Sequence, residues 1–222
     1  MKGSNLHNLA ARMPALHGRW KRLRSLYRRI VYRTSLLKAA QKGPVRVVIG
    51  SNGVFQPGWH PTEADFLDLL RPAQWEEIFS RHPVEAILAE HVWEHLTEAQ
   101  GLEAARTCFR FLMPCGTLRA AVPDGLHPDP QYHHWTKPGG CGPSADGHKL
   151  FYTYHTFCKV FEQAGFAVEL LEYFDERGEF HARDWDPAAG RINRSLRFDR
   201  RNRDGRPHYT SIILDARKPK GA

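Results

Sequence analysis

Short apolar runs alternate along the chain with segments whose apolar residues recur at helical spacing. The runs that predict buried strands are rich in Val, Ile, Leu and Ala, and they cover residues 45–50, 84–89, 117–123, 167–174 and 209–216. The segments that predict helices cover residues 20–40, 98–112 and 151–166. Strands that alternate with helices in this way are typical of an α/β fold with a mostly parallel, doubly wound sheet.

Local signals mark several boundaries of these elements. Thr97-Glu98-Ala99-Gln100 has the form of a capping box, which satisfies free amides at a helix start. Gly43-Pro44 ends the first predicted helix, and Gly165 closes the last one. Residues 175–208 form a long connection crowded with Arg, Asp and Gly. Connections of this length are usually lids over a site or disordered.

Basic charge is concentrated at the N-terminus. Residues 1–43 contain eleven Lys or Arg and no acid, although the whole chain has 32 basic and 24 acidic residues. We therefore divide the chain into a basic arm, residues 1–43, and a mildly acidic main domain, residues 44–222. Apolar residues recur at helical spacing within the arm, namely Trp20, Leu23, Tyr27, Ile30 and Val31. This amphipathic helix either packs on the main domain or attaches to an anionic surface, lipid or nucleic acid.

The remaining composition is that of an ordinary globular protein, with 41% hydrophobic and 25% charged residues. The four cysteines form no C-x-x-C pair, which predicts free thiols in a reducing compartment. The sequence has no apolar run of about 18 residues and no apolar stretch typical of a secretion signal. We expect a cytoplasmic protein, with peripheral membrane attachment as one role for the arm. An acid-free, Arg-rich start is also typical of an organellar transit peptide.

The stretch His91-Val92-Trp93-Glu94-His95 fits H-x-x-E-H, by which one group of zinc proteases holds its metal on a helix. Here the pattern lies between a predicted strand and the capping box, where no helix of sufficient length is expected. We therefore rank a zinc protease as a distant third hypothesis. Two other interpretations remain: Glu94 and His95 are turn and packing residues, or the turn contacts a cofactor.

Five short motifs follow one another in a characteristic order. They read GSNG at 50–53, GWHPTE at 58–63, AEHVWEHL at 89–96, LMPCG at 112–116 and AVPD at 121–124. In this order they resemble the class I S-adenosylmethionine-dependent methyltransferases, in particular a bacterial group that reads roughly GSG, GWINID, SEHVLEHL, LxPGG and AVPD. The resemblance covers about residues 44–218. It implies a Rossmann-like sheet with flanking helices and an antiparallel last strand.

The resemblance implies that S-adenosyl-L-methionine binds at the carboxyl edge of the sheet. Its cofactor-binding residues are then Gly50, Ser51, Asn52, Gly53, Glu63, Glu90 and His91. Glycines after the first strand allow close approach of the backbone, and the Glu63 carboxylate can accept both ribose hydroxyls. Asp65 and Asp68 are neighbouring alternatives to Glu63. The loop departs from the family's usual G-x-G because Asn52 replaces the second glycine.

The candidate catalytic residues are His91 and Asp124, since a base is needed when the methyl acceptor carries a proton. Polar and aromatic groups after the third predicted main-domain strand suggest a substrate pocket, lined by His127, Tyr132, His148 and Tyr152. No spacing among the His and Asp residues is diagnostic of metal ligands, so we expect no metal site. The sequence predicts a methyltransferase whose acceptor is unidentified. The main alternative is a catalytically inactive relative that serves as a binding or assembly module.

Overall fold

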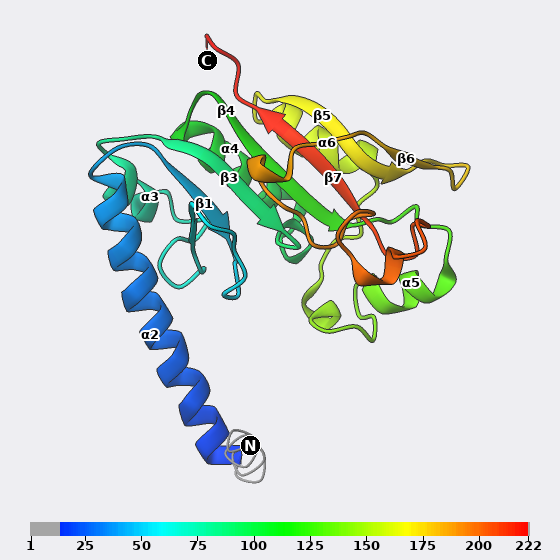
Figure 1. Ribbon diagram of the computed structural model, residues 1–222, viewed down its shortest axis with the longest axis horizontal. Coiled ribbons are helices and arrows are strands. Elements are labelled where there is room, and N and C mark those ends of the chain that lie inside the picture. The colour runs from blue at the N-terminus through cyan, green and yellow to red at the C-terminus, as the bar shows by residue number, and fades with distance from the viewer. Residues whose placement is uncertain (1–13, 222) are drawn as a thin grey trace.

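The computed structural model describes residues 14–221, which contain one seven-stranded sheet (Figure 1). The strand order is β2-β1-β3-β4-β7-β5-β6. The strands are β1 (Val45–Ile49), β2 (Trp59–Pro61), β3 (Val84–Glu90), β4 (Leu112–Pro123), β5 (Ala167–Phe174), β6 (Phe180–Ala182) and β7 (Ser211–Arg217). The three-residue strands β2 and β6 are too short to be seen in the hydrophobic pattern of the sequence.

The sheet is mixed and mostly parallel, as the sequence predicts. Strands β2, β1, β3 and β4 pair in parallel, whereas β7 runs antiparallel between β4 and β5. The last strand therefore has the predicted antiparallel direction. The carboxyl ends of β1, β3 and β4 lie together at one edge, where open α/β folds usually bind ligands.

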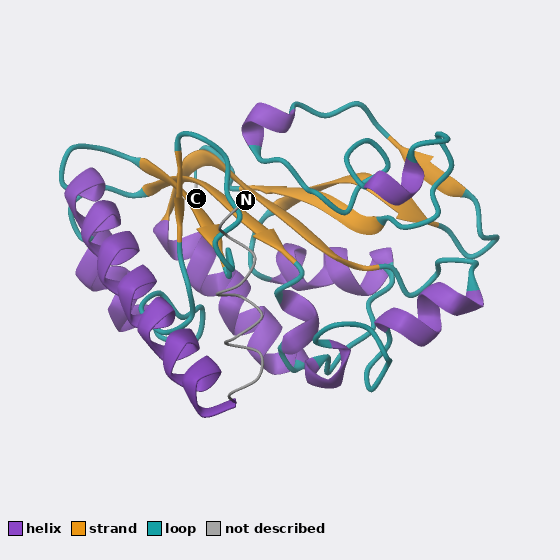
Figure 2. Cartoon of the chain, turned by 60° about the horizontal axis from the view of Figure 1, so that its bottom comes forward, coloured by secondary structure: helices purple, strands orange, loops and turns teal. Residues whose placement is uncertain are grey.

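Helices cover one face of this sheet (Figure 2). They are α2 (Pro14–Ala40), α3 (Pro72–Phe79), α4 (Glu98–Phe111) and α6 (Tyr154–Gln163), while α5 (Pro130–Thr136) lies beyond the ends of the strands. The larger core cluster joins residues of these four helices, such as Leu36, Trp75 and Phe161, to the strands. The capping box is present: Thr97 Oγ1 accepts from the Gln100 amide, and the Gln100 side chain accepts from the Thr97 amide.

Helix α2 is buried only at its C-terminal end, where Leu36 and Ala40 join the core. Further toward the N-terminus the helix projects from the rest of the molecule (Figure 1), and Leu23, Tyr27 and Ile30 are exposed. Trp20, another residue of the predicted apolar stripe, has a side chain outside the described part. The packing alternative thus holds for the last turns of α2 and not for residues 23–31. Among the described helices, none is both long enough and apolar enough to cross a bilayer.

An irregular segment, residues 183–202, covers the second face of the sheet (Figure 2). Trp185 and Ile192 from this segment pack on Val48, Leu88 and other strand residues in a smaller core cluster. The sequence identifies residues 175–208 as a lid or as disordered. Part of this connection instead packs on the sheet and belongs to the core. It takes the place of a layer of helices on this face.

Arg119 of β4 fixes the path of this segment. Its guanidinium is 2% exposed and pairs with both carboxylate oxygens of Asp215 on β7, at 2.7 and 2.8 Å. Nη1 also donates to the carbonyl oxygens of Asp186 and Gly190, each at 2.8 Å. The planar group lies 4.8 Å from the ring centroid of Trp185. Because a buried charge is tolerated only when it is paired and hydrogen-bonded, the bonds from Nη1 to these two carbonyl oxygens stabilise the segment in this position.

Candidate functional site

A cavity of about 700 Å³ opens at the carboxyl ends of β1 and β3. This volume is within the range that small-molecule sites usually have. One wall is the turn after β1, a second is the turn after β3, and a third comes from residues 191–201. Residues Pro143, Ser144 and His148 close the remaining side.

The turn after β1 contains the predicted glycine motif, residues 50–53. Gly50, Asn52 and Gly53 have φ values of 59, 45 and 80°, which is the left-handed region. A Cβ atom added to Gly50 would lie 3.2 Å from Val92 Cγ2 in the turn after β3. Gly50, Ser51 and Asn52 line the cavity, and Gly53 does not. The substitution of Asn for the second glycine is accommodated because Asn tolerates the left-handed conformation.

Glu63 lies behind this turn and does not line the cavity. Ser51 Oγ donates to Glu63 Oε1 at 2.9 Å and accepts from the Gly53 amide at 3.1 Å. Glu63, the acidic residue predicted to bind the ribose, is therefore in direct contact with Ser51 of the glycine turn.

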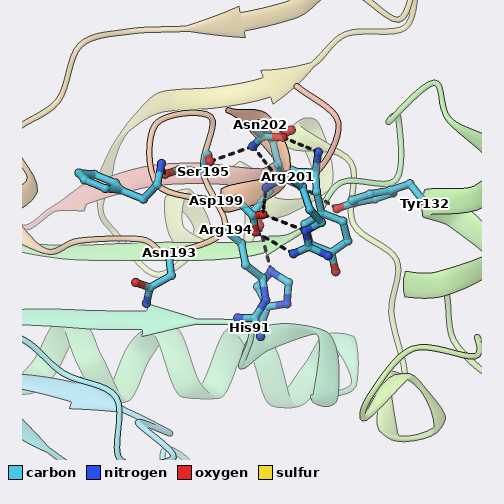
Figure 3. A network of polar contacts seen from close by, with 12 residues as sticks. His91, Tyr132, Asn193, Arg194, Ser195, Asp199, Arg201 and Asn202 are labelled. Carbon is cyan, nitrogen blue, oxygen red and sulfur yellow. Dashed lines mark hydrogen bonds and ion pairs between the residues drawn. The ribbon is translucent and has the colours of Figure 1, made fainter. Parts of the chain in front are cut away.

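Glu90 ends β3 and binds residues 193–194. Its carboxylate accepts from the Asn193 amide and Nδ2, and from the Arg194 amide and Nη1, at 2.9 to 3.2 Å. Figure 3 shows Asn193 and Arg194 on the same side of the site as Asp199 and Arg201. Glu90 thus joins the edge of the sheet to the wall formed by residues 191–201.

His91 follows in the left-handed conformation, with φ 57°. Its Nε2 is 2.9 Å from Ser211 Oγ, and its Nδ1 is 3.3 Å from Glu94 Oε1 without the alignment of a hydrogen bond. Burial, followed by the nearby positive charge of Arg194, lowers the pKa of His91 well below its usual value. The imidazole is therefore neutral at neutral pH.

Glu94 and two further histidines lie beside His91. The Glu94 side chain is 1% exposed, and burial raises its pKa to about 8. His148 Nε2 is 4.0 Å from Glu94 Oε1, and the His95 and His148 ring centroids are 4.8 Å apart. Glu94, His95 and His148 all line the cavity. The sequence interpretation of Glu94 as a turn residue holds, since η1 (Trp93–His95) is a single 3₁₀ turn.

Asp124 is fully buried away from the cavity lining. Its Oδ1 accepts from the Leu126 amide at 2.9 Å, and its Oδ2 accepts from the Phe174 amide at 2.7 Å. Because both oxygens bind backbone amides, Asp124 connects the end of β4 to the end of β5. This geometry gives no support to the predicted catalytic role.

Three of the four predicted substrate residues are also buried outside the cavity lining. His127 and Tyr132 stack with ring centroids 4.0 Å apart, and the Tyr132 hydroxyl donates to the Thr210 carbonyl oxygen at 2.8 Å. Tyr152 packs on Phe157 in the core below α4. Only His148 of this set lines the cavity. The aromatic character that suggests a pocket lining in the sequence belongs instead to a packed support behind the site.

The cavity has basic residues that the sequence analysis did not single out. Arg191, Arg194 and Arg201 line it, and Arg201 forms a two-point ion pair with Asp199 at 2.7 and 2.8 Å. The Arg201 guanidinium also lies 3.2 Å from the Tyr209 ring centroid. The three arginines belong to the long 175–208 connection. The length of this connection and its content of Arg are the sequence signals that could have indicated a role in the site.

No family model matches this chain, and no curated protein matches it in sequence. Solved structures with a similar chain path include a SAM-dependent methyltransferase from Archaeoglobus fulgidus, with 14% identity and a TM-score of 0.44 over 86% of this chain and 94% of that chain. An O-methyltransferase family protein from Burkholderia thailandensis has 12% identity and a TM-score of 0.47 over 90% of this chain. This chain spans 57% of the Burkholderia protein and 56% of a candidate O-methyltransferase from Nostoc punctiforme. Likeness at this level assigns neither an activity nor a substrate.

The pH dependence of stability tests the burial of the Asp124 carboxyl group. Burial raises the pKa of Asp124 to about 6, so the folded chain holds this proton more tightly than the unfolded chain does. Ionisation of Asp124 therefore lowers the free energy of unfolding as the pH rises from about 4 to about 6, by up to about 3 kcal/mol. Asp124→Asn lacks this ionisation and leaves one backbone amide facing an NH₂ group, at a cost of about 1–3 kcal/mol.

We expect Asp124→Asn to be less stable than the wild type in urea unfolding, with a larger difference at pH 4.5 than at pH 7. A difference that does not change with pH would contradict the burial of an ionisable Asp124.

Proposed function

We propose that this protein is an S-adenosyl-L-methionine-dependent methyltransferase. The observation that carries the proposal is that two of the five motifs of the family resemblance, the glycine turn after β1 and Glu90-His91 after β3, line the same cavity. Their position at the carboxyl edge of a mostly parallel sheet, with an antiparallel β7, supports it further. The acceptor of the methyl group is not part of the proposal.

The residues that would hold the cofactor are those of the turn after β1 and the end of β3. The close packing at Gly50 fits a ligand that approaches the backbone, since any side chain there would meet Val92. Glu63 lies outside the cavity lining and supports the turn by accepting from Ser51 Oγ. When bound, the cofactor supplies a methyl group activated as a sulfonium.

The chain's own contribution is to position the acceptor and to remove its proton. Methyl transfer is an in-line displacement, so orientation within the cavity is the main requirement. His91 is neutral and lines the cavity, and with its Nε2 beside Ser211 Oγ it is the candidate base for an oxygen or nitrogen acceptor. Residues 191–201 form the wall of the cavity on this side.

Calorimetric titration of the full chain with S-adenosyl-L-methionine tests the proposal. We expect micromolar binding by the wild type and binding at least about tenfold weaker by Gly50→Val, because the new side chain displaces the turn from Val92. Gly205→Val is the matched control. It introduces valine at another left-handed glycine, with φ 80°, where a Cβ atom meets nothing within 4 Å.

Absence of binding by the folded wild type would refute the methyltransferase and favour the inactive binding module. Equal weakening by both variants would show that the effect of Gly50→Val is general strain rather than loss of the site.

The arm supports a second proposal, that α2 attaches the protein to an anionic lipid surface. Leu23, Leu26, Tyr27 and Ile30 form one exposed stripe at i, i+3, i+4 and i+7, and each side chain is at least half exposed. Arg28 and Arg29 lie within the same stretch. Nucleic acid would use the basic residues alone, whereas a lipid interface also buries the apolar stripe.

Co-sedimentation with anionic vesicles should retain the full chain at low salt and release it as salt rises. Ile30→Glu should weaken retention about tenfold or more, since it removes about 1.5–3 kcal/mol of apolar burial. Ser25→Glu adds the same charge on the opposite, polar face of the helix and should have a smaller effect. Tight binding to duplex DNA with equal effects of both variants would instead favour nucleic acid.

A further inference from the structure

We propose that Glu94, His95 and His148 form a binding site for a divalent transition-metal ion at the floor of the cavity. One ligand atom from each residue lies within 4.8 Å of the other two. The residues come from two segments, the η1 turn after β3 and the loop that follows η2 (Ala145–Gly147). The inference does not depend on the proposed cofactor.

The Glu94 carboxylate is the first observation that points to a ligand. Both of its oxygens are buried, and neither has a hydrogen-bond partner within the described residues. Buried polar atoms are nearly always hydrogen-bonded, and a buried carboxylate without a partner is costly. A metal ion bound between Glu94 and the two histidines would satisfy the carboxylate.

Backbone carbonyl oxygens fix the tautomers of the two imidazoles. His95 Nδ1 is 3.1 Å from the Gly147 carbonyl oxygen, and His148 Nδ1 is 2.7 Å from the Thr136 carbonyl oxygen. A carbonyl oxygen accepts only, so each Nδ1 carries the proton and each Nε2 keeps its lone pair. Second-shell bonds of this kind fix the tautomer and the ring direction of ligating histidines.

The backbone holds the two segments together before any ion binds. The amides of Lys149 and Leu150 both donate to the Glu94 carbonyl oxygen, at 2.7 and 3.2 Å. The His95 contact with Gly147 adds a third link between the same segments. The site therefore needs only a small contraction of side chains to reach metal–ligand distances of about 2.0–2.2 Å.

Two imidazoles and one carboxylate, with a side open to the cavity, are a ligand set that suits zinc and related first-row ions. The assignment differs from the zinc-protease pattern, which would use His91 and His95 as ligands and Glu94 as base. Here His91 Nε2 contacts Ser211, and His148 supplies the second imidazole. The open side would bind an oxygen ligand, either water or a polar group of a substrate.

A second group of suitable residues, Asp175, Glu179 and His181, serves as an internal comparison. It is partly exposed, and its Asp175 oxygens already accept from His181 and from the amides of Arg177 and Glu179. Hydrogen bonds within the protein therefore satisfy the Asp175 carboxylate, whereas the Glu94 carboxylate has none from residues 14–221.

Titration calorimetry with Zn²⁺ near neutral pH, on the tag-free full chain, tests the site. The expected result is one equivalent of zinc for the wild type, and roughly 100-fold weaker binding or none for Glu94→Gln and His148→Ala. His181→Ala should bind like the wild type. Zinc should also raise the thermal unfolding temperature of the wild type and of His181→Ala, but not that of Glu94→Gln or His148→Ala, and the same unfolding transitions verify that each variant folds.

The absorption spectrum of bound Co²⁺ separates this ligand set from the exposed thiols of Cys115 and Cys141, since thiolate ligands add a strong near-ultraviolet charge-transfer band. A d–d spectrum without that band supports the site. No zinc binding by the folded wild type, a thiolate spectrum, or binding unaffected by both Glu94→Gln and His148→Ala would overturn it.

Discussion

The ion pair of Arg119 with Asp215 is the interaction on which the shape of the site depends. The sheet has apolar side chains on both faces, and the helices cover only one of them (Figure 2). Residues 183–202 must therefore bury the second face although they form no long helix. Arg119, buried between β4 and this segment, sets its course through the carbonyl oxygens of Asp186 and Gly190. An alternative path would leave a buried guanidinium with unsatisfied donors, which costs several kcal/mol.

The position of this segment then determines the walls of the cavity. From Gly190 the chain continues toward the carboxyl edge of the sheet, and the amides of Asn193 and Arg194 reach the Glu90 carboxylate. Arg201 and Asp199 close the same side. The cavity thus lies between two turns at the edge of the sheet and a segment that also completes the core.

Much of the fold could be predicted from the sequence because its signals are local. The apolar runs of β1, β3 and β7 and the capping box at Thr97 act over a few residues, and the structure has them where the pattern places them. Helix α3 was not predicted because its eight residues mix polar and apolar side chains and its N-cap, Arg71, makes no side-chain cap bond.

The site could be predicted only in part, because its residues come together through tertiary packing. Gly50 and His91 follow directly from strand ends. Arg194 and Arg201 reach the cavity only because the segment from 183 crosses the sheet, which no spacing in the sequence encodes. Tyr132 and Asp124 were predicted to be site residues, but both are buried outside the cavity lining. A polar or aromatic residue in a loop after a strand can point into the protein and stabilise the packing behind the site. The sequence pattern does not distinguish that orientation from a pocket lining.

We propose that the glycine turn after β1 and the end of β3 form one binding site for S-adenosyl-L-methionine. A crystal structure of the full chain with S-adenosylhomocysteine tests it most directly. The predicted result is electron density for the ligand within the cavity, against the backbone of Gly50–Asn52 and beside Glu90 and His91. Density at any other place, or a cavity that stays free of ligand at saturating concentration, would contradict the account.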